Sequence, residues 1–97
     1  MLVHIVVWKY KAETGEDVRE DHRSKLSGLP EQIPDIISFE VGADILRLGR
    51  SYDTGLVARY PDRAAFDHYT SHPAHQAVAK MGKEIASDVV SVDFISR

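Results

Sequence analysis

The residues best able to do acid–base chemistry gather in one short stretch that begins at Tyr69 and ends at His75. It contains a phenol, two imidazoles and a proline, in the order Tyr-Thr-Ser-His-Pro-Ala-His. An imidazole has an unperturbed pKa of about 6.5, so it can accept a proton near neutral pH. A tyrosine hydroxyl can donate a hydrogen bond to the enolate that forms when a carbonyl compound loses a proton. We therefore expect this stretch to form one wall of a pocket.

Tyr69 and His75 can converge only if the helix that carries them is interrupted. Six residues along a continuous α-helix would place the two side chains on different faces. The residue before a proline avoids the α region, so the helix containing Tyr69 should stop before His72, and a second helix should begin at about Pro73. The His72 ring then lies where it can cap the second helix, and we expect this structural role rather than direct chemistry.

A metal site is an alternative use of the two histidines, His72 and His75. The proline separates them, and no carboxylate lies at a spacing typical of metal motifs, so we expect no metal. The chain has no cysteine, which excludes disulfides, thiolate nucleophiles and cysteine-ligated zinc. We expect no cofactor.

Length and charge limit the number of domains and the kinds of partner that this chain can have. The 97 residues make a single domain, 1–97, whose core is small enough that oligomerisation would help to complete it. The net charge is −3 and no basic patch is visible, so nucleic acid is not an expected partner. No window approaches the roughly 20 apolar residues that span a bilayer, and the start lacks the features of a signal peptide. We expect a cytoplasmic protein without membrane contact.

The hydrophobic pattern predicts four strands with helices between them. The order is β-α-β-β-α-β, which is the ferredoxin-like α+β arrangement of a four-stranded antiparallel sheet with helices on one face. We expect Thr14 to cap the first helix, Pro30 and Pro34 to stiffen a short connection, and Gly42 to mark a bulge or a close backbone approach. The expected strands are 2–10, 36–43, 54–60 and 88–95, and the expected helices are about 14–28, 62–71 and 73–85.

Alternation along the first strand separates two faces. Val3, Ile5 and Val7 point away from the helices, and His4 and Trp8 point toward them. The outward face would expose an apolar patch that is costly to leave in water. We therefore expect a homodimer in which two sheets pack face to face as a dimeric α+β barrel.

Two further histidines have both a structural and a functional interpretation. His4 lies in an apolar strand, where a histidine is more often a hydrogen-bonded core residue than a catalyst. His22 lies on the inward stripe of the first helix with Leu26. We expect His22 to be an edge residue with one solvated nitrogen, although its position also suits a pocket lining.

Several motifs of this chain, taken in order, resemble those of the stress-responsive A/B barrel domain family. The most specific is Tyr69-Thr-Ser-His-Pro-Ala-His75, which fits the family's Tyr-x-x-His-Pro-x-His signature. The resemblance spans almost the whole chain and implies a dimer with an apolar cavity between sheet and helices in each subunit. The other matching features are His4 in the opening strand, Ile33-Pro34-Asp35-Ile36, Val41-Gly42-Ala43-Asp44 and Tyr52-Asp53.

The resemblance also implies roles for single residues. In the family's plant polyketide cyclases, of the olivetolic acid cyclase type, the counterpart of His75 is the base and that of Tyr69 orients the substrate. The cyclase has a further pocket histidine where this chain has Thr54, and His22, Arg23 and Leu26 replace its aromatic helix lining. The resemblance therefore does not extend to the cyclase's substrate. The expected substrate-contacting residues are His4, Trp8, His22, Leu26, Leu56 and His72.

Three function classes follow. The first is a cyclase, lyase or isomerase acting on a small hydrophobic carbonyl compound through His75 and Tyr69. The second is a non-catalytic small-ligand-binding or stress protein that uses the same cavity. The third is a cofactor-free monooxygenase of a related dimeric α+β barrel family, which no motif here favours. The cavity discriminates between the first two, because an enzyme needs both side chains free to face the void.

Overall fold

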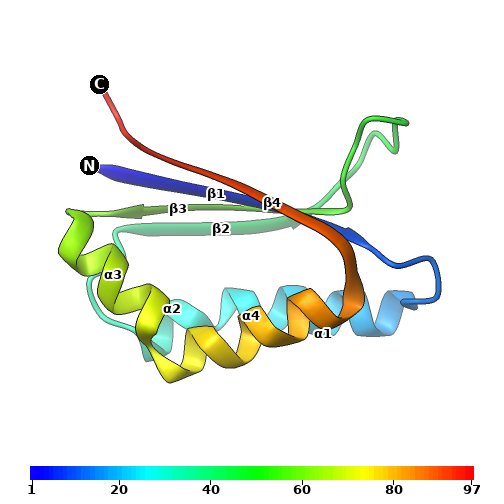
Figure 1. Cartoon of the computed structure of the whole chain (residues 1–97), viewed down its shortest axis with the longest axis horizontal. Coiled ribbons are helices and arrows are strands. Elements are labelled where there is room, and N and C mark those ends of the chain that lie inside the picture. Colours follow the sequence, from blue (N-terminus) through cyan, green and yellow to red (C-terminus); the bar gives the residue numbers. More distant parts are fainter.

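The protein, described over residues 1–97 by a computed structural model, is a four-stranded antiparallel sheet with all its helices on one face (Figure 1). The strands lie in the order β2-β3-β1-β4, which confirms the ferredoxin-like α+β fold. In chain order the elements are β1 (Leu2–Tyr10), α1 (Glu16–Ser27), α2 (Leu29–Gln32), β2 (Ser38–Ala43), β3 (Thr54–Tyr60), α3 (Arg63–Ser71), α4 (Pro73–Ile85) and β4 (Ala86–Ile95).

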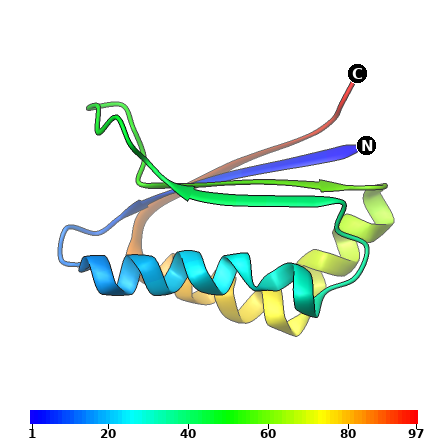
Figure 2. The same cartoon turned by 180° about the vertical axis from the view of Figure 1, so that it is seen from behind.

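The core lies between the sheet and the two long helices, α1 and α4, which run beneath it (Figure 2). Strand β1 is central because it pairs with β3 on one side and β4 on the other. Its side chains alternate between the two faces, with Val6 and Trp8 buried on the helix side as expected. On the outer face Val3 is only 4% exposed and Ile5 and Val7 are half-buried, so the expectation that these three form the exposed patch is wrong, and the exposed apolar residues of that face lie on β4 instead. No helix is both long and apolar enough to cross a bilayer.

The second strand begins later than the expected range of 36–43. Asp35 adopts a left-handed conformation with φ of 66°, which turns the chain just before the strand. Ile37 donates its backbone N–H to the Arg59 carbonyl at 2.8 Å, but regular pairing starts only at Ser38. The apolar run predicted the strand correctly and missed the turn that delays it.

Gly42 is not a bulge, and that expectation is wrong. Pairing of β2 with β3 continues without a shift through Gly42, and a Cβ added there would meet no atom within 4 Å. The register shift of this sheet lies instead between Lys9 and Tyr10, where β1 pairs with β4. Strand β4 also starts at Ala86, earlier than the expected range of 88–95, because Tyr10 pairs with Ala86 beyond this shift.

The start of the first helix also differs from expectation. Gly15, not Thr14, occupies the N-cap position of α1, and no side chain caps the helix. The Thr14 hydroxyl instead donates to the Ile85 carbonyl at 2.9 Å, which ties this loop to the end of α4. The segment stiffened by Pro30 and Pro34 also contains the short helix α2, because a proline is compatible with a first helical turn.

His22 is fully buried on α1, so the expectation of a solvated nitrogen is wrong. Its Nδ1 lies 2.8 Å from the Tyr10 hydroxyl, which donates to Thr54 Oγ1 at 2.9 Å. Arg23 Nη1 donates to the same threonine oxygen at 3.2 Å. Because the Tyr10 hydroxyl donates its proton to Thr54, His22 Nδ1 must be protonated and donate to the Tyr10 oxygen. His22 Nε2 is left buried without a hydrogen-bond partner. This cluster joins α1 to β1 and β3.

We predict that His22 makes stability depend on pH. Burial, with a smaller effect of Arg23, lowers its pKa to about 4, against about 6.5 in the unfolded chain. As pH falls below 6.5 the unfolded chain binds the proton first, so stability is lost between about 6.5 and 4, by roughly 2–3 kcal/mol from this group. Urea denaturation across this pH range should show that the free energy of unfolding falls less steeply with decreasing pH for His22→Asn, whose amide can still donate to Tyr10, than for the wild type. Equal slopes of the free energy of unfolding against pH in the two proteins would contradict the low pKa assigned to His22.

We also predict that Gly82→Ala destabilises the fold, because α4 packs closely against side chains of β1 and α1 there. A Cβ at Gly82 would lie 2.9 Å from Trp8 Nε1 and 3.0 Å from His22 Nε2. Overpacking of about 1–3 kcal/mol should exceed the gain in helix propensity of up to about 1 kcal/mol. Gly28→Ala is the control, since its nearest contact would be 3.6 Å. Chemical denaturation should rank Gly82→Ala below both wild type and control, and equal stability would contradict this packing.

Candidate active site

The helical interruption lies where the sequence predicts it. Helix α3 begins at Arg63 and ends at Ser71, and the carboxylate of the preceding Asp62 caps it by accepting the Ala65 N–H at 2.9 Å. His72 is extended (φ −66°, ψ 134°), as expected for a residue before proline. Its ring Nδ1 accepts the Ala74 N–H at 3.1 Å and so caps α4. The His72 ring is therefore occupied in holding the junction.

The junction brings Tyr69 and His75 together. Their ring centroids lie 4.5 Å apart with the planes tilted by 47°. Tyr69 is 1% exposed, and His75 is half-buried. Two side chains that an unbroken helix would separate thus share one wall.

That wall borders a cavity of about 170 Å³ between the sheet and the helices. Six of the eight residues predicted for the site line it, and they come from five elements. His22 and His72 do not, because one is sequestered in the α1 cluster and the other caps α4. The predicted residues that line it are His4, Trp8, Leu26, Leu56, Tyr69 and His75. Those not predicted are Val6, Ala79, Lys83, Val89, Val90 and Ser91.

His75 has the protonation state of a base. Its Nδ1 donates to the Thr70 carbonyl at 3.0 Å, which leaves the lone pair on Nε2. Burial lowers the pKa of His75, the bond to Thr70 partly offsets this, and nearby His4 lowers it further. The imidazole is therefore neutral near pH 7 and available to accept a proton.

Tyr69 has the protonation state of a donor. Burial raises its pKa to about 12, and the neighbouring Tyr60 hydroxyl lowers it by a smaller amount. The Tyr60 ring lies 5.2 Å from that of Tyr69, and its hydroxyl is buried without a well-formed hydrogen bond. Tyr69 therefore remains a phenol at neutral pH.

Sequence reasoning missed Tyr60, although its place at the end of β3 on the same face as Leu56 was a usable signal.

His4 is held by a partner from the opposite end of the chain. Its Nδ1 hydrogen-bonds to the Asp93 carboxylate, and strand pairing places the two residues side by side. The His4 ring lies 6.3 Å from that of Tyr69 and 5.0 Å from that of Phe66. It is thus both a hydrogen-bonded strand residue and part of the cavity wall. Asp93 was missed because alternation gives its face but not its cross-strand neighbour.

The arrangement offers acid–base groups rather than metal ligands. No group of three or more histidine, aspartate and glutamate side chains is placed to hold a metal ion. His72 and His75 each use Nδ1 within the protein, in the cap and in the bond to Thr70. The chemistry available is proton transfer by His75 with hydrogen-bond donation by Tyr69.

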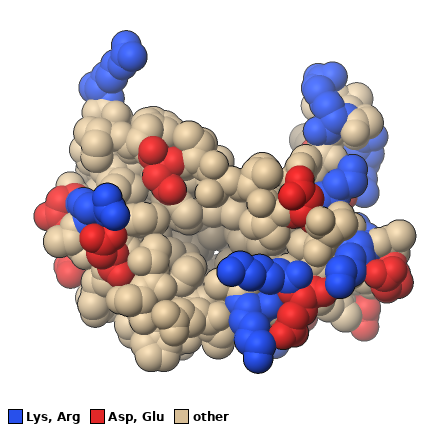
Figure 3. Space-filling view, in the orientation of Figure 1, with Lys and Arg blue, Asp and Glu red and all other residues tan.

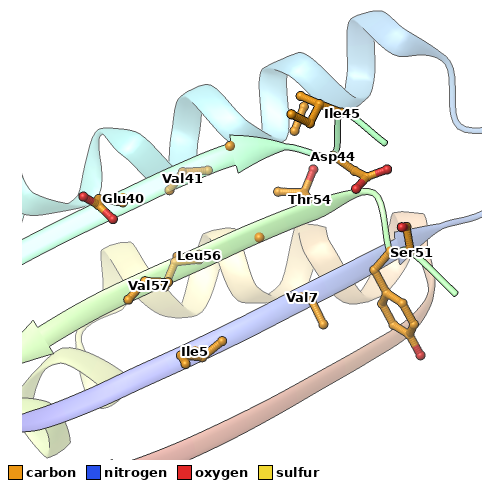
Figure 4. A pocket seen from close by; sticks show the side chains of 14 residues that line it. Ile5, Val7, Glu40, Val41, Asp44, Ile45, Ser51, Thr54, Leu56 and Val57 are labelled. Carbon is orange, nitrogen blue, oxygen red and sulfur yellow. The ribbon is translucent and has the colours of Figure 1, made fainter. Parts of the chain in front are cut away.

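A larger, open hollow of about 590 Å³ lies on the other face of the sheet (Figure 4). Figure 4 shows Ile5 and Val7 of β1 beside Val57 of β3, with Glu40 of β2 at its edge. The loop between β2 and β3 rises alongside it (Figure 1). Neither Tyr69 nor His75 reaches this hollow, so it is separate from the acid–base pair.

Comparisons with solved structures agree on the fold. A dimeric ferredoxin-like protein of unknown function from Thermobifida fusca is 28% identical, with a TM-score of 0.89 and coverage of 98% of this chain and 90% of that one. A hydroxynitrile lyase from Passiflora edulis is 16% identical, with a TM-score of 0.89 over 99% and 93% of the two chains. An antibiotic biosynthesis monooxygenase is 18% identical, with a TM-score of 0.79 over 100% and 99%.

No curated protein sequence is significantly similar to this chain. The sequence profile of the stress responsive A/B barrel domain, by contrast, matches residues 2–96. The match covers nearly the whole chain and includes every residue of the cavity wall. The protein therefore belongs to the stress-responsive A/B barrel domain family.

Proposed function

We propose that the protein is an enzyme of the cyclase, lyase or isomerase type that acts on a small hydrophobic carbonyl compound. The observation that carries this proposal is the pairing of Tyr69 and His75, 4.5 Å apart, on the wall of one largely apolar cavity. One ring is a neutral base and the other a protonated donor at the same pH. A cavity that only enclosed an apolar ligand would need neither a base nor a hydrogen-bond donor.

The first step uses both residues. His75 Nε2 takes a proton from the carbon next to the substrate carbonyl, the electron pair of that C–H bond forms a C=C bond, and the π electron pair of the C=O bond moves onto the oxygen. The Tyr69 hydroxyl donates a hydrogen bond to the resulting enolate oxygen. The imidazolium, held through Nδ1 by Thr70, then returns the proton to another carbon or to a leaving group. Return to carbon gives isomerisation, and loss of the group gives a lyase reaction.

The fold is compatible with such chemistry. A hydroxynitrile lyase is among the proteins of the same fold, although at 16% identity its activity does not transfer to this chain. A non-catalytic ligand-binding role would use the same cavity. The catalytic role is preferred because the Tyr69 hydroxyl makes no hydrogen bond to the backbone, and His75 makes only one, through Nδ1.

We predict that the protein exchanges the methyl protons of acetophenone with D₂O, which proton NMR measures without knowledge of the natural substrate. Loss of the base in His75→Ala should slow exchange at least about 100-fold, and loss of the donor in Tyr69→Phe about 10- to 100-fold. His68→Ala is the control, because His68 is exposed on α3 and does not line the cavity.

Undiminished exchange in folded His75→Ala would show that His75 is not the base. Binding of acetophenone without any exchange by the wild type would instead identify a ligand-binding protein.

We further propose that two copies pack through the sheet face opposite the helices. Val90, Val92 and Phe94 of β4 are 44–52% exposed there, in register with residues of β1 on the same face. An apolar sheet face of this extent favours a partner surface over water. The similar Thermobifida fusca protein is described as dimeric.

We predict that Val92→Asp yields a folded monomer, because Val92 is already 52% exposed in the single chain and a buried carboxylate would oppose the dimer. Ala77→Asp, on the exposed side of α4, should remain dimeric. Sedimentation equilibrium measures both. A dimeric Val92→Asp, or a monomeric wild type, would exclude this interface.

A further inference from the structure

We infer that the ligand of this cavity is a compound about the size of one six-membered ring that carries a carboxylate at the end opposite its carbonyl group. The carboxylate pairs with Lys83 at the mouth, and the carbonyl reaches Tyr69 and His75. This inference rests on the proposed function and adds the class of substrate to it.

The size of the ligand follows from the cavity. An apolar cavity of roughly 150 Å³ accommodates one benzene molecule. The present cavity is about 170 Å³, so it has room for one ring with a small substituent. Trp8, Leu26 and Leu56 make its walls apolar, which suits a ring rather than a polar chain. A long acyl chain would have to leave through the mouth into water.

The charge of the ligand follows from Lys83. It is the one lysine, arginine, aspartate or glutamate among the lining residues, so no carboxylate of the protein faces the cavity. Lys83 forms none of the ion pairs of this structure, whereas Lys25 is paired. Figure 3 shows basic side chains on one side of a hollow between the sheet and the helices, with acidic side chains next to them and uncharged surface on the opposite side. Lys83 is exposed, so its ammonium is free to pair with an anionic ligand group that reaches the mouth.

The two polar ends of the cavity are separated along α4. His75 lies in the first turn of that helix and Lys83 in the last, which are about 12 Å apart at a rise of 1.5 Å per residue. Side chains lean toward the N-terminus of a helix, so the Lys83 side chain extends back over the cavity. A ring with its carbonyl and its carboxylate in para positions matches this layout. A lysine in the last turn of a helix also interacts favourably with the helix dipole, but that interaction does not depend on whether a ligand is bound.

Two isosteric probes test the inference, namely 4-acetylbenzoate and the neutral 4-acetylbenzamide. Calorimetry at low ionic strength should show the wild type binding the carboxylate at least about fivefold more tightly, and added salt should reduce the ratio. Lys83→Met keeps the apolar stem and should abolish the preference while leaving the amide's affinity unchanged. Lys80→Met is the control, because Lys80 is exposed on α4 like Lys83 and carries the same charge but does not line the cavity.

Each outcome bears on a distinct claim. Equal affinity of the two probes for the wild type, or a preference that survives in Lys83→Met, overturns the carboxylate assignment and leaves the proposed enzyme intact. Tighter binding of an analogue with a hexyl ketone than of the acetyl probe overturns the size assignment. Failure of both probes to bind overturns this inference and the proposed ligand cavity together.

Discussion

Pro73 imposes the constraint on which the rest of the site depends. It cannot continue a helix from α3, and it holds the preceding residue, His72, outside the α region. The His72 ring then satisfies a backbone N–H at the start of α4, so the break does not leave the new helix uncapped. The chain turns within one residue, and Tyr69 on one helix comes to lie against His75 on the next.

The sheet separates chemistry from assembly. Because side chains alternate along β1, His4 and Trp8 reach the cavity while Ile5 and Val7 reach the hollow on the opposite face. The same chain segment therefore serves two surfaces that need not communicate. A charge introduced on the outer face should alter association without entering the acid–base pair.

Local patterns in the sequence predicted most of the fold correctly. Runs of apolar and β-branched residues located the strands, alternation assigned the faces of β1, and the proline rule located the junction between α3 and α4. What the sequence could not supply were contacts between distant segments. The bond of His4 to Asp93 depends on strand register, and the approach of Lys83 to the cavity depends on how α4 lies across the sheet. Neither is encoded in spacing along the chain.

The fate of His22 shows the same limit. Its place on the inward stripe of α1 was evident, but whether it met water, a ligand or the protein depended on Tyr10 and Thr54 from two strands. The short helix α2 and the left-handed Asp35 were also missed, because proline-rich connections follow turn geometry rather than hydrophobic period.

The central claim is that the α3–α4 junction creates one acid–base site within the cavity. A crystal structure of the protein with bound acetophenone tests it most directly. The account predicts the ketone oxygen at about 2.7–3.1 Å from the Tyr69 hydroxyl, with the methyl carbon facing His75 Nε2. Acetophenone bound in the outer hollow beside Ile5, with Tyr69 and His75 directed only at protein atoms, would contradict it.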